Sequence, residues 1–169
     1  MATATRAEAF SYRDHTFATE GELVLRLLDE FRCAEQFAAE YLRRWIEVSD
    51  QERVRGGLRV IQQREEYHGR LLEARLRELG GVPACTPPEA RQRDVPFYAA
   101  ADRTDAEKLL AVAARLRDPN AVLQPLRDAV AQVQSDQQTR ALLDLLVEDE
   151  VSSVQWLRGI CAAVNPPAA

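Results

Sequence analysis

The sequence predicts an all-α protein, a four-helix bundle with a long crossover between its second and third helices. Four pairs of the capping-box type place Ser or Thr three residues before Glu or Gln, and each pair precedes a long stretch with helical spacing of apolar residues. Glycine and proline stops close these stretches where helices should end. The stretches also recur at a fixed separation along the chain. We expect no strands.

The first helix is expected over residues 20–48, after the Thr19–Glu22 pair, and the second over residues 50–79, after the Ser49–Glu52 pair. Gly80-Gly81 should end the second helix, because glycine readily takes the left-handed conformation found just past helix ends. Residues 80–103 contain four prolines and therefore predict a long connection.

The third helix should begin near Thr104, at the Thr104–Glu107 pair. Proline lacks a backbone donor and clashes with the preceding turn, so this helix should be kinked or split near Pro119. The fourth helix is expected over residues 136–164, after the Ser135–Gln138 pair and before Pro166. These bounds give an N-terminal arm over residues 1–18, a single bundle domain over residues 19–164 and a C-terminal tail over residues 165–169.

The two halves of the chain share one design. Thr19 and Thr104 are 85 residues apart, and Ser49 and Ser135 are 86 residues apart. The apolar positions and their polar interruptions follow nearly the same shift, so that Glu65 corresponds to Glu150. Helices with one apolar face each bury those faces most simply against one another, which favours two helical hairpins packed as a bundle.

Composition excludes several classes of function. With 169 residues, of which 46% are hydrophobic and 29% charged, the chain should form one domain with a sizeable core. Its net charge of −5, with basic residues interspersed among acidic ones, argues against nucleic acid and membrane partners. The first residues lack the apolar segment of a signal peptide, and Cys33, Cys85 and Cys161 lack metal-site spacing. We therefore expect free thiols and a cytoplasmic protein.

Four ionisable residues interrupt the apolar faces of the expected helices: Glu35, Glu65, His68 and Glu150. A charge in a bundle core is costly unless it is paired or bound to a metal. Glu65 and His68 stand three residues apart, so their side chains leave the same face of one helix. Carboxylate oxygens with an imidazole nitrogen suit iron or manganese, and zinc is less expected without a thiolate ligand.

These residues resemble those of the ferritin-like superfamily, in particular its rubrerythrin and bacterioferritin branch, and the resemblance covers residues 19–164. In that family each helical hairpin supplies one Glu from its first helix and a Glu-x-x-His from its second, and together they hold two metal ions. The resemblance implies that Glu35 is a terminal carboxylate ligand and His68 an imidazole ligand. It likewise implies that Glu65 and Glu150 are the two bridging carboxylates.

The second hairpin departs from this pattern. Ser153 stands where the second histidine is expected, and Asn120 stands where the second terminal glutamate is expected. Asp118 and Asp149 are nearby acids that could substitute, but their register points them away from the apolar face. The resemblance therefore implies an incomplete di-metal carboxylate site, holding one ion or two weakly, with oxidase- or peroxidase-type chemistry where the ion is iron. It assigns no catalytic residue.

Two interpretations stay open. In the first, the four residues bind metal. In the second, they hydrogen-bond to one another in a metal-free bundle that serves as an interaction or structural protein, with the bundle faces available for a homodimer. Tyr41 and Tyr67 should pack in the core or line the site, and His15 should lie at the surface. Gly56-Gly57 either permits a close helix approach or is simply tolerated.

Overall fold

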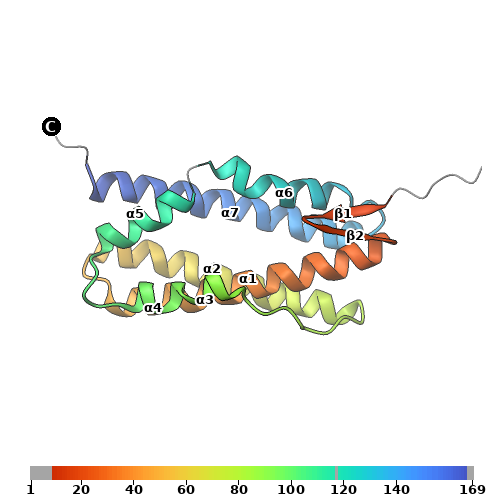
Figure 1. Cartoon of the computed structure of the whole chain (residues 1–169), viewed down its shortest axis with the longest axis horizontal. Helices are drawn as coiled ribbons and strands as arrows, with labels where there is room; N and C mark the ends of the chain where they lie inside the picture. The colour runs from red at the N-terminus through yellow and green to blue at the C-terminus, as the bar shows by residue number, and fades with distance from the viewer. Residues whose placement is uncertain (1–8, 117, 167–169) are drawn as a thin grey trace, which may run out of the picture.

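The computed structural model describes residues 9–116 and 118–166, with the side chains of Ala90, Pro119 and Asn120 outside this description. The protein is mostly helical, as expected for an all-α chain. Two long helices, α1 (Glu20–Val48) and α2 (Glu52–Glu78), form an antiparallel hairpin (Figure 1). A third long helix, α7 (Gln137–Val164), lies beside two shorter ones, α5 (Asp105–Arg115) and α6 (Pro119–Ala131).

The ends of α2 show one prediction confirmed and one wrong. Gly80 has a φ of +79°, and the backbone N–H of Gly81 donates to the carbonyl of Leu76 over 2.9 Å, so the glycine pair ends the helix as predicted. The start is different. Gln51, not Ser49, is the N-cap residue, and its side chain makes no capping bond. The Ser49 hydroxyl instead donates to Asp105 over 2.8 Å, because α5 brings that carboxylate within reach.

Of the predicted caps at the other helix starts, two are confirmed and one is wrong. The capping box of Thr104 and Glu107 is complete at the start of α5. Thr19 caps α1 by accepting from the backbone N–H of Glu22. At the start of α7 the N-cap is Asp136 and not Ser135, and its carboxylate accepts from the backbone N–H of Thr139 over 3.0 Å.

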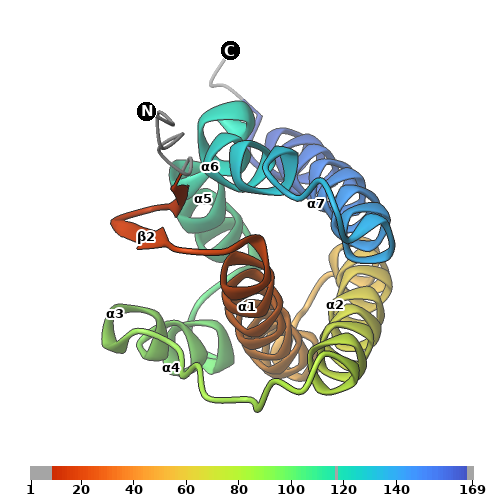
Figure 2. The same cartoon turned by 90° about the vertical axis from the view of Figure 1, so that its right-hand side faces the viewer.

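The connection between α2 and α5 is not a plain loop. It contains two short helices, α3 (Glu89–Gln92) and α4 (Asp94–Ala99), and α4 packs against α1 (Figure 2). Tyr98 of α4 is 1% exposed and stacks on Trp45 of α1 with ring centroids 5.1 Å apart. The crossover therefore contributes to the core through one large aromatic side chain.

The expectation of no strands is wrong for the N-terminal arm. Strands β1 (Phe10–Tyr12) and β2 (His15–Phe17) pair as an antiparallel hairpin, with Arg13 at a φ of 52° in the turn. The side chain of Gln132, just after α6, both donates to and accepts from the backbone of Ser11, over 2.8 Å each way. Tyr12 is 4% exposed, so the hairpin contributes a core residue at this end of the molecule.

The apolar core is divided into two clusters. One joins the first half of α1 to the second half of α2, α6 and the first half of α7, and the other joins the remaining halves to α4 and α5. Along α1, Leu28 belongs to the first cluster and Leu42 to the second, with Glu35 between them. Polar residues thus form a layer between two apolar clusters. No helix within the described ranges combines the length and apolarity that crossing a bilayer requires.

Candidate metal centre

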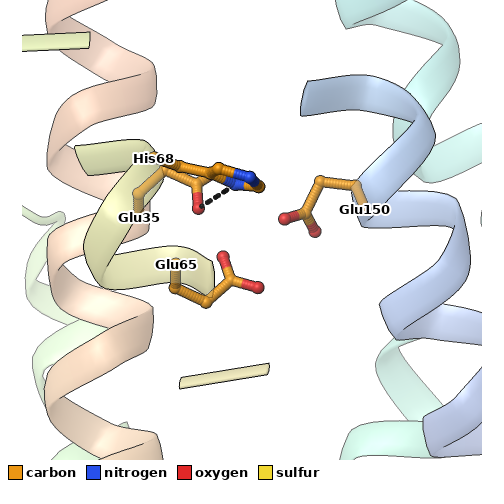
Figure 3. A group of neighbouring side chains, drawn as sticks. All are labelled: Glu35, Glu65, His68 and Glu150. Atoms are coloured by element: carbon orange, nitrogen blue, oxygen red, sulfur yellow. Dashed lines mark ion pairs between the residues drawn. The ribbon is translucent and has the colours of Figure 1, made fainter. Parts of the chain in front are cut away.

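Four side chains meet in the polar layer between the two apolar clusters. Glu35 comes from α1, Glu65 and His68 come from α2, and Glu150 faces them from α7 (Figure 3). Each offers one ligand atom, and these atoms all lie within 4.8 Å of one another. The structure therefore brings together all four residues that the sequence analysis singled out, at a spacing that one ion could span.

The carboxyl groups of this cluster lie largely out of water. Glu35 and Glu65 are 3% and 4% exposed, and Glu150 is partly exposed. Burial raises the pKa of Glu35 to about 8 and that of Glu65 to about 9. Burial, followed by the charge of Glu65, raises the pKa of Glu150 to about 8. Near neutral pH these carboxyls must therefore retain protons or be compensated by a cation.

The two ring nitrogens of His68 have different neighbours. Its Nε2 lies 3.0 Å from Oδ2 of Asp149, and because a carboxylate only accepts hydrogen bonds, Nε2 carries the proton. Nδ1 then has a free lone pair, and it lies 3.5 Å from Oε2 of Glu35. Both of these atoms are buried without a hydrogen-bond partner. Two acceptors that face each other need a proton or a cation between them, so the donor set fits a metal ion.

Asp149 corrects an expectation of the sequence analysis. Its register on α7 predicted a side chain pointing away from the apolar face, and that side chain is indeed 45% exposed. Its carboxylate nevertheless reaches across to α2 and accepts from His68. A carboxylate that holds the distal nitrogen of a histidine fixes the ring orientation and makes the other nitrogen a better ligand. Asp149 therefore belongs to the site as a positioning residue.

Ser153 and Arg64 lie next to Asp149 in the same region. Ser153 is buried on α7, at the position where the resemblance places a second histidine, and its hydroxyl accepts from Nη2 of Arg64. The Nη1 nitrogen of Arg64 lies 3.5 Å from Oδ1 of Asp149. Sequence reasoning missed Arg64 altogether. Its separation of 85 residues from Asp149, the same shift that relates the two halves of the chain, is the signal that could have identified it.

The remaining candidate ligands do not join the cluster. Asp118 is exposed, and its carboxylate accepts from the backbone N–H of Ala121 at the start of α6. The side chain of Asn120 lies outside the described residues. The three cysteines are free thiols, and Cys33 and Cys161 are buried.

The two tyrosines and the N-terminal histidine are placed differently. Tyr67 is 54% exposed, so the expectation that it packs in the core or lines the site is wrong. Tyr41 stacks on Tyr98, with ring centroids 5.0 Å apart, and belongs to the aromatic packing between α1 and α4. His15 is exposed in β2, as expected for a surface residue.

The arrangement can bind a cation through three carboxylates and an imidazole nitrogen. Outside these ligands, the Asp149 carboxylate contacts His68 and the Arg64 guanidinium contacts Ser153. Comparison with known proteins adds no second line of argument. No protein-family model matches the chain, and no curated protein is similar to it in sequence.

Proposed function

We propose that this chain is a ferritin-like metal-binding protein that holds one transition-metal ion through Glu35, Glu65, His68 and Glu150. The observation that carries the proposal is the convergence of three carboxyls and one imidazole within 4.8 Å, between two apolar clusters. A carboxylate cluster of this kind is costly without a counter-charge, and a divalent cation supplies one.

The order of the helices supports the ferritin-like part of the proposal. The hairpin of α1 and α2 is followed by a long connection and then by α5, α6 and α7 (Figure 1). In this interpretation α5 and α6 are the two parts of one third helix, divided before Pro119, and α7 is the fourth. The first hairpin then supplies a Glu and a Glu-x-x-His, while the second supplies Glu150 alone.

Iron and manganese fit the donor set better than zinc, because oxygen ligands outnumber nitrogen and no thiolate is present in the cluster. When bound, redox-active iron would supply the oxidation or peroxide chemistry that the ferritin-like resemblance implies. The protein's own contribution is to hold the ligands in a layer with little water and to fix the His68 ring through Asp149.

Elemental analysis tests this proposal directly. The protein is purified without a metal-affinity step, supplemented with iron or manganese, desalted and analysed for iron, manganese and zinc. The wild type should retain about one ion per chain, and a Glu65→Ala, His68→Ala double variant should retain essentially none. The expected result follows from loss of one carboxylate and the only imidazole of the cluster.

The matched control is a Glu66→Ala, Arg70→Ala double variant, because these two residues form an exposed ion pair on the same helix. It should retain as much metal as the wild type. Equal metal content in the wild type and the Glu65→Ala, His68→Ala variant would overturn the proposal. Circular dichroism of each variant establishes that the helices are intact.

A second candidate function, a metal-free interaction protein, is favoured by one observation. Large apolar side chains are exposed on the two helices that carry the cluster, namely Val60 and Tyr67 on α2 and Leu145 on α7. Self-association through these helices would cover them. Light scattering of the wild type and a Val60→Glu variant tests this candidate, which predicts a dimer for the first and a monomer for the second.

A further inference from the structure

Helices α2 and α7 present equivalent positions to the interior. Every buried position of α2 recurs, 85 residues later, as a buried or partly buried position of α7. The pairs are Val54 with Thr139, Leu58 with Leu143, Ile61 with Leu146, Glu65 with Glu150, His68 with Ser153, Gly69 with Val154, Leu72 with Leu157 and Leu76 with Cys161. The two helices are therefore structural counterparts, and residues at equivalent positions can be compared directly.

The contacts around the cluster cross between these counterparts. Arg64 and Asp149 occupy equivalent positions and carry opposite charges. Asp149 reaches His68, and Arg64 reaches Ser153, which is the counterpart of His68. Arg64 and Asp149, whose charged groups lie 3.5 Å apart, thus place a guanidinium on a hydroxyl and a carboxylate on an imidazole.

The Arg64 guanidinium is a permanent cation, since arginine does not lose its proton in proteins. Its side chain is only 21% exposed, and its Nε is buried without a hydrogen-bond partner. Its guanidinium lies next to the cluster, because it donates to the buried Ser153 hydroxyl and lies 3.5 Å from Asp149, whose carboxylate contacts His68. A second metal ion near Ser153 would meet a fixed positive charge, and a serine hydroxyl at the position where α2 supplies the His68 imidazole.

We propose that Arg64 takes the place of a second cation, so that the cluster binds one metal ion and not two. This inference rests on the proposed metal-binding function and names the residue that limits it to one ion. In it, the Arg64 charge balances part of the carboxylate charge that a second ion would otherwise balance. Arg64 is thus a specificity-determining residue and not a ligand.

Titration with Mn²⁺ as the probe tests the inference. Bound manganese per chain is measured at saturation, and electron paramagnetic resonance distinguishes an isolated ion, with its six-line spectrum, from an exchange-coupled pair. The wild type should saturate at one isolated ion. An Arg64→Met, Ser153→His double variant, which removes the charge and supplies a nitrogen ligand, should saturate at two ions with a coupled spectrum.

The matched control is an Arg64→Lys, Ser153→His double variant, which gains the same ligand but retains the positive charge. It should saturate at one ion. The inference is overturned if the wild type binds a coupled pair, if the Met variant saturates at one ion, or if the Lys variant binds two. Failure of the wild type and all variants to bind Mn²⁺ would instead reject the proposed function itself.

Folding is monitored separately, so that a misfolded variant cannot decide the result. Circular dichroism of each metal-free variant should match that of the wild type. If the Met variant does not fold, an Arg64→Gln, Ser153→His variant takes its place, because glutamine is neutral and retains a hydrogen-bond donor. Two ions are expected for that variant, and one would overturn the inference.

Discussion

The carboxylate of Asp149 on α7 accepts a hydrogen bond from Nε2 of His68 on α2 over 3.0 Å. This contact joins the two helices that are counterparts in the two halves of the chain. It also decides which nitrogen of His68 is available, because protonated Nε2 leaves Nδ1 facing Glu35.

An Asp149→Asn substitution should weaken metal binding without removing a ligand. An amide is a poorer partner for the Nε2 proton, so the ring is less well fixed and Nδ1 is less basic; the affinity loss for such changes is roughly 10- to 100-fold. Competition with a chelator measures the affinity. The control is Glu148→Gln, the same charge change at the adjacent, exposed position, and an equal loss there would contradict the assigned role.

The metal-free protein should lose stability as pH rises. Below about pH 4.5 the carboxyls of Glu35 and Glu65 are protonated in both the folded and the unfolded chain. Above that pH the unfolded chain ionises while the buried groups keep their protons up to pH 8 or 9, so unfolding releases protons. Each group then lowers the free energy of unfolding by up to about 1.4 kcal/mol per pH unit.

Urea unfolding in the presence of a chelator at pH 5 and pH 8 measures this dependence. A Glu65→Gln variant should show a distinctly flatter dependence, because its side chain does not titrate. Glu66→Gln alters an exposed neighbour on the same helix and should leave the dependence unchanged. Identical pH dependence in the wild type and the Glu65→Gln variant would contradict the raised pKa.

The adjacent glycines of α2 should respond in opposite directions to alanine. A Cβ at Gly57 would lie 1.8 Å from the Trp156 ring of α7, whereas a Cβ at Gly56 would meet nothing within 4 Å. Gly57→Ala should therefore cost about 1–3 kcal/mol through overpacking. Gly56→Ala should stabilise the protein by about 1 kcal/mol, because alanine is the better helix former. Chemical unfolding compares the two variants, and a stable Gly57→Ala protein would argue against the close approach.

Asp105 should be a strong structural determinant outside the candidate metal centre. Its carboxylate accepts from Nε1 of Trp45 over 2.6 Å, from the Ser49 hydroxyl over 2.8 Å and from the backbone N–H of Gln51 over 3.1 Å. Burial acts to raise the pKa of Asp105, but these hydrogen bonds outweigh it and lower the pKa below its ordinary value. The stabilisation is therefore present at neutral pH and lost in acid.

An Asp105→Ala substitution should cost about 2–4 kcal/mol at pH 7, because it leaves buried donors without an acceptor. The deficit relative to the wild type should shrink as the pH falls below about 4. Thermal and urea unfolding measure both effects. Asp102→Ala removes an exposed aspartate of the same segment and should change stability by less than about 0.5 kcal/mol.

Much of the helical framework and the cluster itself could be predicted because both leave a pattern among residues that are close in the sequence. The glycine stop at Gly80-Gly81 and the capping box at Thr104 act through residues within a few positions. The cluster is visible because Glu35, Glu65, His68 and Glu150 interrupt apolar positions with helical spacing. A buried ionisable residue stands out wherever its neighbours in register are apolar.

The features that were mispredicted depend on contacts between distant segments. The β1–β2 hairpin is short and is completed by Gln132, which lies 121 residues away from Ser11. Ser49 carries the right residue type for a cap, but Asp105 engages its hydroxyl from another helix. The role of Asp149 depends on how α7 is placed against α2, and helical periodicity alone does not give that placement.

The exposed fractions of the side chains in the polar layer show where solvent reaches this layer. The side chains of Glu35 and His68 are at most 5% exposed, whereas those of Arg64 and Asp149 are 21% and 45% exposed. A hydrated ion approaching between α2 and α7 would meet this pair of opposite charges first. The rates at which a metal ion binds and dissociates should therefore depend on ionic strength and on the separation of the Arg64 and Asp149 side chains. The equilibrium affinity, by contrast, is set by the buried ligands.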